Sequence, residues 1–186
     1  EILVEIIIKD QKSLENSCEE LINCTPKFKQ VLNLHGFPSI RKRSGGFKAL
    51  LKTIISQQLS VAAASNIWER VESQGFANLK AIKSADEAAL RSLGLSRQKV
   101  QYVKSLAFSG IKFNTFEGSG DEEIISILTS VKGIGLWSAE IYLMFSMMRS
   151  DIFPAGDLAL QISASHLFEN NEKLSEKELR EKSLSW

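Results

Sequence analysis

The stretch LTSVKGIGLWSAE, residues 128–140, decides the fold, because an apolar helix end runs into Gly-Ile-Gly and a second helix opens at once. Gly133 and Gly135 let the backbone approach a ligand closely, and the amides that open the second helix can bind an anion such as a phosphate. A Gly-x-Gly corner on its own is more often an ordinary connection between helices. The stretch therefore predicts a helical hairpin, whose role depends on what surrounds it.

The rest of the chain also has the punctuation of helices. Three Ser-x-x-Glu patterns, which begin at Ser84, Ser119 and Ser175, are typical of capping boxes. Apolar residues recur every three or four positions over 47–55 and 100–107, as on the buried face of a helix. Three prolines and no Asn-Gly or Asp-Gly turn give little sign of a sheet; residues Ile2–Ile8 are the one strand-like stretch. The sequence predicts an all-α fold.

The connections between helices are short. Gly94 should end one helix and Ser96 should cap the next. Ser44–Gly46 is the best hinge candidate, and Asn114–Gly120 is a second loop rich in Gly and Ser. We therefore expect successive helices that are joined by tight turns.

The hinges predict a two-lobed organisation. We expect a single domain over 1–186, with one lobe from approximately 1–46 and a C-terminal part, and one from 47–150 with the hairpin at 129–138. A cleft should separate the lobes. The amphipathic stretch before Trp186 looks unfinished, so the chain is expected to be trimmed at its C-terminus.

Composition limits the classes of protein. A chain of 186 residues with 44% apolar and 24% charged residues can bury a core without disulfides. Its net charge of +1 means that any DNA-binding surface has to be a local patch. Cys18 and Cys24 are too few for an iron–sulfur cluster. The longest apolar run near the start is too short to span a membrane, so we expect an intracellular protein, in a bacterial cytoplasm or nucleoid or a eukaryotic nucleus.

A single aspartate follows the hairpin after an apolar helix and a Pro-containing loop, in FPAGDLALQ, residues 153–161. Asp157 stands before an apolar helical run, where free amides and the helix dipole favour an ionised carboxylate. Such a carboxylate can stabilise the positive charge left on a sugar when a base departs, or orient the attacking water. A plain N-cap aspartate is the alternative, and would be preferred if no hairpin preceded it.

Four separated motifs carry a family resemblance. TIISQQLSVAAA at 53–64, LGLSRQKV at 93–100, the hairpin and FPAGDLALQ stand in the order found in helix-hairpin-helix DNA glycosylases. The chain resembles this superfamily over roughly residues 26–168, in particular its 3-methyladenine DNA glycosylase II branch. Each motif alone is weak, and the specificity lies in their order and spacing.

The resemblance implies a two-lobed helical fold with a DNA-binding cleft, and an enzyme that flips alkylated purines out of damaged double-stranded DNA. It would hydrolyse the N-glycosidic bond of 3-methyladenine or 7-methylguanine and leave an abasic site, as a monomer and without an organic cofactor. Asp157 would be the catalytic residue. Bifunctional relatives have a lysine nucleophile where this chain has Trp137, so no lyase activity is expected.

The resemblance also assigns a base pocket. Trp137 would line it and stack on an electron-poor alkylated purine, although a tryptophan at a helix start can also belong to the core. Ile141 and Leu158 stand where known relatives carry pocket tyrosines, which leaves the breadth of substrates open.

The remaining assignments concern DNA and a cation. Either Gln58 or Leu59 would fill the gap left by the flipped base, while Gln57 would tie the backbone of its own turn. The phosphate contacts fall to three hairpin residues: Lys132, Gly133 and Gly135. A monovalent Na⁺ or K⁺ would be held by three backbone carbonyls, those of Thr129, Val131 and Ile134.

Three alternatives stay open. A non-catalytic helix-hairpin-helix module would bind DNA with no use for Asp157. A glycosylase for another lesion, such as hypoxanthine or ethenoadenine, would differ only in the pocket. A helical protein–protein adaptor would show no salt-dependent affinity for DNA.

Overall fold

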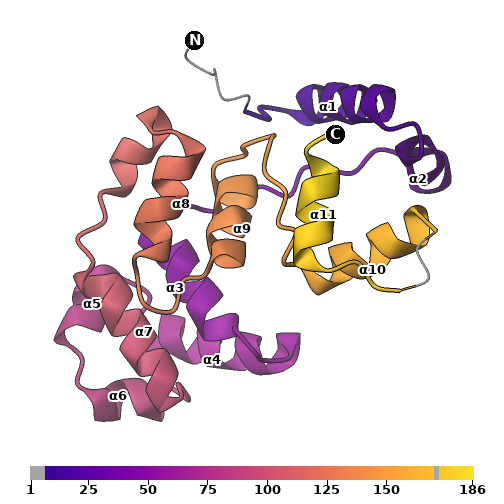
Figure 1. Cartoon of the computed structure of the whole chain (residues 1–186). Helices are drawn as coiled ribbons and strands as arrows, with labels where there is room; N and C mark the ends of the chain where they lie inside the picture. The colour runs from indigo at the N-terminus through magenta and orange to yellow at the C-terminus, as the bar shows by residue number, and fades with distance from the viewer. Residues whose placement is uncertain (1–6, 170–171) are drawn as a thin grey trace. The chain divides into compact units, whose positions relative to one another are not determined.

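The computed structural model describes residues 7–169 and 172–186, and over these residues it is helical with no named strand (Figure 1). The predicted all-α fold is confirmed. Of the strand-like stretch 2–8, residues 2–6 lie outside the described part, and Ile7 forms an isolated bridge with Arg149. No helix in the described part is long and apolar enough to cross a membrane. The elements are α1 Gln11–Cys24, α2 Phe28–His35, α3 Gly46–Ser56, α4 Val61–Ser73, α5 Leu79–Ser84, α6 Glu87–Ser92, α7 Arg97–Phe108, the 3₁₀ helix Phe113–Gly118, α8 Asp121–Thr129, α9 Leu136–Ser146, α10 Leu158–Leu167 and α11 Glu176–Ser183.

The chain divides into two compact units. We call Arg43–Tyr142 the central unit, and Glu1–Lys42 together with Leu143–Trp186 the terminal unit. The sequence placed these divisions near residues 46 and 150. Helix α9 crosses the second division, so it contributes residues to both units.

Helices α3 and α7 form the core of the central unit. The predicted apolar stripes are buried on both: Leu50, Leu51, Ile54 and Ile55 on α3, and Val100, Val103, Leu106 and Ala107 on α7. The two helices pack against each other. Each fully buried leucine or isoleucine contributes about 1.5–3 kcal/mol to the free energy of folding. The packed faces of α3 and α7 therefore hold in place the segments that flank these two helices.

The predicted helix starts are only partly right. Ser175 forms the full capping box with Glu178, and Ser96 caps α7. The prediction at Ser84 is wrong: this residue ends α5, and Asp86 caps α6 instead by accepting from the amide of Ala89 at 2.7 Å. Aspartate caps as well as serine does, so two candidates two residues apart cannot be ranked by pattern.

The segment before α8 also differs from its prediction. Gly120, not Ser119, is the N-cap of α8 and offers no side chain to the helix. Most of the expected loop Asn114–Gly120 belongs to the 3₁₀ helix, which Phe116 anchors with a side chain that is only 2% exposed. Burial of one aromatic side chain thus orders a Gly/Ser-rich stretch that the sequence suggested to be irregular.

The terminal unit has its own apolar cluster beneath α10 and α11. Ala155, Ala164, Leu174 and Leu179 are buried, and Trp186 packs against them and stacks on Phe168 at 5.7 Å between ring centroids. Because Ala155 belongs to the loop that precedes α10, this cluster fixes the path of the chain before Asp157.

Candidate functional site

The hairpin between α8 and α9 is a tight turn anchored by apolar side chains. The amide of Val131 donates to the carbonyl of Leu128 at 3.2 Å, and the amide of Ile134 donates to that of Val131 at 3.0 Å. The side chains of Val131 and Ile134 are 3% and 4% exposed. The turn is therefore fixed from the inside, while Lys132 and Gly135 face solvent.

The two hairpin glycines have different roles. Gly133 has a φ of +97°, and a Cβ there would lie 2.2 Å from Cγ of Tyr102, which no side chain can tolerate. Gly135 has nothing within 4 Å of its Cβ position and stands directly before α9. Gly133 is thus required for packing, whereas Gly135 leaves the backbone before α9 open to approach.

The start of α9 has the character of an anion site. Gly135 has no side chain that could cap the helix, and the first amides of a helix have no acceptor within it. Leu136 and Trp137 in the first turn are 39% and 40% exposed. Trp137 is therefore not a buried core residue.

The segment between α3 and α4 is a type II turn. Gln57 has φ −54° and ψ 133°, Gln58 has φ +56°, and the amide of Leu59 donates to the carbonyl of Ser56 at 3.3 Å. The expectation that Gln57 ties its own turn is wrong. Its Nε2 instead donates to the carbonyl of Gly133 at 2.8 Å, across to the hairpin.

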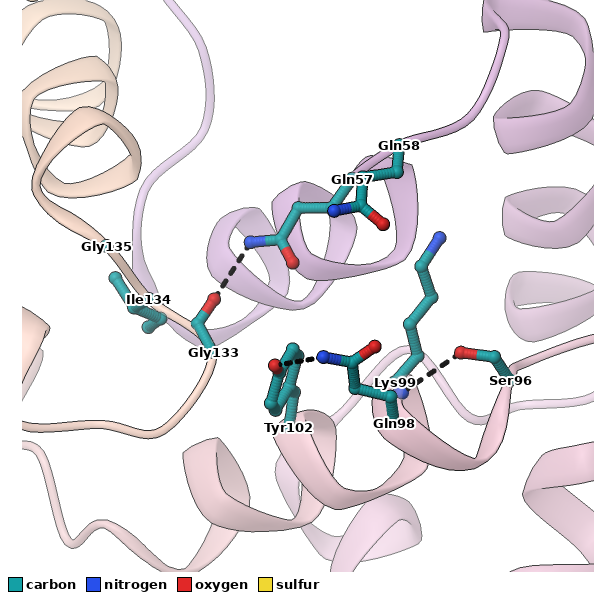
Figure 2. A pocket seen from close by; sticks show the side chains of 9 residues that line it. All are labelled: Gln57, Gln58, Ser96, Gln98, Lys99, Tyr102, Gly133, Ile134 and Gly135. Atoms are coloured by element: carbon teal, nitrogen blue, oxygen red, sulfur yellow. Dashed lines mark hydrogen bonds between the residues drawn. The ribbon is translucent and has the colours of Figure 1, made fainter. Parts of the chain in front are cut away.

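A polar hollow of about 360 Å³ opens between this turn, the start of α7 and the hairpin (Figure 2). Nε2 of Gln98 donates to Oη of Tyr102 at 2.5 Å, and Nζ of Lys99 donates to the carbonyl of Ile55 at 2.6 Å. Partial burial lowers the pKa of Lys99. The sequence flagged this start of α7 as a family-like segment but gave Gln98, Lys99 and Tyr102 no role.

Cations gather on two neighbouring helices of the central unit. Helices α5 and α7, which pack together, contain five lysines and arginines and no aspartate or glutamate: Lys80, Lys83, Arg97, Lys99 and Lys104. Lys132 of the hairpin donates to Oε1 of Gln101 on α7 at 3.3 Å. These two helices and the adjoining Lys132 are therefore the candidate for the local basic patch that DNA binding requires.

Asp157 lies in the terminal unit as the N-cap of α10. Its Oδ1 accepts from the amides of Ala159 at 2.9 Å and Leu160 at 3.2 Å, as the sequence predicted for a helix N-terminus. Its own amide donates to the carbonyl of Pro154 at 2.9 Å. The helix therefore holds the carboxylate of Asp157, and the preceding loop holds its backbone.

A buried glutamine that sequence reasoning missed supports this loop. Gln161 is 6% exposed, donates from Nε2 to the carbonyl of Ala155 at 2.9 Å, and accepts from Nζ of Lys173 at 2.8 Å. Its position four residues after Asp157, between Leu160 and Ile162, was the available signal. The side chain connects the chemistry-bearing loop to the segment before α11.

The expected site residues thus divide between the units. Asp157 and Leu158 belong to the terminal unit; the hairpin, Gln58, Leu59, Trp137 and Ile141 belong to the central unit. Leu158 is 59% exposed and Ile141 is half-buried on α9.

The hairpin also supplies the donor type for a monovalent cation. Among the described residues no cluster of three His, Cys, Asp or Glu side chains could hold a metal ion. The carbonyl of Val131 already accepts from Ile134, but a carbonyl oxygen has a second lone pair. The neutral oxygens of this turn therefore fit a Na⁺ or K⁺ ion better than a transition metal.

Comparison with known proteins places the chain in a family of DNA repair proteins. Residues 51–186 match the family described as HhH-GPD superfamily base excision DNA repair protein. A DNA-3-methyladenine glycosidase from Bacillus halodurans is similar in structure, with a TM-score of 0.81 and 32% identity over 91% of this chain and 82% of that one. The 3-methyladenine DNA glycosylase of Schizosaccharomyces pombe, solved in complex with abasic DNA, gives a TM-score of 0.79 and 26% identity over 91% and 88%.

Curated relatives have the same names. The chain is 35% identical to DNA-3-methyladenine glycosylase 1 of Schizosaccharomyces pombe, over 62% of this chain and 54% of that protein. It is 29% identical to the DNA-3-methyladenine glycosylase of Saccharomyces cerevisiae, over 95% and 67%. The chain thus spans about half the length of the first relative and two thirds of the second.

Proposed function

Because this chain belongs to the HhH-GPD superfamily of base excision DNA repair proteins, we propose that it is a monofunctional DNA glycosylase that releases alkylated purines, such as 3-methyladenine and 7-methylguanine, from damaged duplex DNA. The observation that carries the proposal is the carboxylate of Asp157, fixed at the N-terminus of α10 by two amides. The names of the relatives support the substrate class.

In the proposed reaction Asp157 acts through its charge. The C1′–N bond breaks, the base leaves with the electron pair, and positive charge develops on the sugar. A fixed carboxylate stabilises that charge and orients a water. The oxygen of this water bonds to C1′, one of its protons passes to the carboxylate and then to solvent, and a hydroxyl is left on C1′. A cationic alkylated purine leaves as a neutral base, so no proton donor is required. The product is an abasic site.

Trp137 supports hydrolysis without strand cleavage. An indole cannot form the Schiff base that a lyase step requires, and Lys132 is five residues earlier and rests on Gln101. The exposed indole can instead stack on a flipped, electron-poor base. We assign Ile141 and Leu158 to the same pocket by resemblance alone.

The hairpin is assigned to the DNA backbone. The amides near Gly135 and the ammonium of Lys132 would bind a phosphate, and Gln58 or Leu59 would enter the base stack. The carbonyls of Thr129, Val131 and Ile134 would hold a monovalent cation there. In this proposal the protein acts as a monomer where the DNA of the cell lies.

The test is release of free base from methylated duplex DNA, with strand breaks scored before and after alkali. We expect 3-methyladenine or 7-methylguanine as the free base, breaks only after alkali, and release slower by about 10²- to 10³-fold with Asp157→Asn. The matched control is Asp151→Asn, which alters an exposed aspartate six residues earlier and should release base as the wild type does.

Two other outcomes would redirect the proposal. Release only from hypoxanthine- or ethenoadenine-containing duplex would keep the glycosylase and change its substrate. Binding to DNA without release of any base, unchanged by Asp157→Asn, would indicate a non-catalytic DNA-binding module instead.

A further inference from the structure

One hydrogen bond joins the two central-unit segments that are proposed to act on DNA. The side chain of Gln57, in the turn after α3, donates to the carbonyl of Gly133 in the hairpin, 76 residues later in the chain (Figure 2). Gln57 is the second residue of a type II turn, and its side chain therefore projects away from the turn.

The turn is a strained one. Gln58, at the third position, has a φ of +56°, where type II turns favour glycine or asparagine. A residue in that conformation persists only when the surrounding structure holds it. The bond from the neighbouring Gln57 is a tertiary contact that can do so, in addition to the local bond from Leu59 to Ser56.

The acceptor end of the bond is equally fixed. The ring of Tyr102 fills the space in which Gly133 would have a side chain, with Cγ 2.2 Å from the Cβ position. Oη of Tyr102 in turn accepts from Gln98 at 2.5 Å. Gly133 is thus fixed by the Tyr102 ring on its Cα side and by Gln57 at its carbonyl, so the bond transmits position instead of adapting to movement.

We propose that Gln57 is a positioning residue, which sets the turn that carries Gln58 and Leu59 at a fixed spacing from the phosphate-binding hairpin. This inference rests on the proposed function. The turn and the hairpin then engage the same duplex together: a side chain of the turn enters the base stack while the hairpin binds the phosphates. A misplacement of about 1 Å between two such elements can cost up to about a hundredfold in rate, so a single bond between them matters.

The experiment separates this role from general DNA affinity. Gln57→Met keeps the length of the side chain and removes the donor. We measure the affinity for a duplex with one abasic site and for the undamaged duplex of the same sequence. The expected result is a loss of about tenfold for the abasic duplex only, the size expected when a donor to a carbonyl is removed. The control is Gln74→Met, at an exposed position at the end of α4.

A spectroscopic readout accompanies the affinities. A 2-aminopurine placed opposite the abasic site brightens when it is unstacked, and Gln57→Met at saturation should show a smaller rise than the wild type does. Thermal unfolding identifies a variant that does not fold. In that case Gln57→Asn, whose amide is one methylene too short to reach Gly133, replaces it with the same expected loss.

The outcomes distinguish this inference from the proposed function. Unchanged affinity for the abasic duplex, or an equal loss for both duplexes, would overturn the positioning role. A wild-type protein that does not prefer the abasic duplex at all would instead count against the glycosylase proposal itself.

Discussion

The N-termini of α9 and α10 use the same physics in opposite ways. Helix α10 is capped by its own Asp157, whose carboxylate takes two of the orphan amides. Helix α9 follows Gly135, which has no side chain to offer to the helix, and Leu136 and Trp137 in its first turn are exposed. The N-terminus of α10 thus holds a negative charge of the protein itself. The N-terminus of α9 can favour a negative charge of a ligand in the same way, through its amides and the helix dipole. A helix N-terminus can therefore hold a carboxylate that takes part in the reaction, as in α10, and a helix N-terminus that follows a glycine can bind a phosphate of the DNA, as proposed for α9.

The largest expected effect breaks the α10 side of this comparison. Asp157→Asn and Asp157→Ala should both reduce the rate of base release by about 10²- to 10³-fold, as expected for loss of a preorganised electrostatic group. Their stabilities should differ, because asparagine caps a helix as well as aspartate and alanine costs about 1 kcal/mol. Single-turnover base release and urea unfolding measure the two effects. Retained activity in Asp157→Asn would reduce Asp157 to a cap.

A pair of glycine substitutions tests the α9 side. Gly133→Ala should lower the free energy of unfolding by about 3 kcal/mol or more, because its Cβ would overlap the ring of Tyr102 at a positive φ. Gly135→Ala, with open space at its Cβ, should cost about 1 kcal/mol at most. Urea unfolding measures both. Equal losses would mean that the hairpin does not depend on the Tyr102 contact.

A smaller effect is expected where Asp157 is held from behind. Gln161→Leu should cost about 1–3 kcal/mol, since the carbonyl of Ala155 and the ammonium of Lys173 lose their buried partner. Base release should fall with it if the carboxylate needs a fixed loop. Gln161→Glu keeps an acceptor for Lys173 and loses only the donor to Ala155, so it identifies which contact matters. Unchanged stability in both variants would show that the loop is held by packing alone.

The sequence predicted what is periodic or local and missed what is distant. The apolar stripes on α3 and α7 and the cap at Ser175 are each written within a dozen residues, and they are confirmed. The cap expected at Ser84 was wrong because Asp86 offers the same chemistry. The bond from Gln57 to Gly133 could not be foreseen, because it depends on how α3 packs beside the hairpin.

The same limit applies to the candidate site. The motif order predicted Asp157 and the hairpin glycines as candidates, and the cap geometry of Asp157 is confirmed. The buried amide of Gln161 and the ring of Tyr102 under Gly133 have no pattern of their own in the sequence. A residue that supports another through a tertiary contact is visible only once the chain is folded.

The smallest expected effect concerns the share of phosphate binding at the start of α9 that comes from backbone amides and not from Lys132. Lys132→Gln should reduce the slope of log affinity for duplex DNA against log salt concentration by about 0.9, the value for one phosphate contact. Affinity should fall only modestly, because the amides near Gly135 stay in place. Titrations at several salt concentrations measure the slope, with Lys29→Gln, at an exposed position on α2, as the control. An unchanged slope would mean that Lys132 serves only its contact with Gln101, and that the phosphate is bound by the backbone at the helix start and not by a side-chain charge.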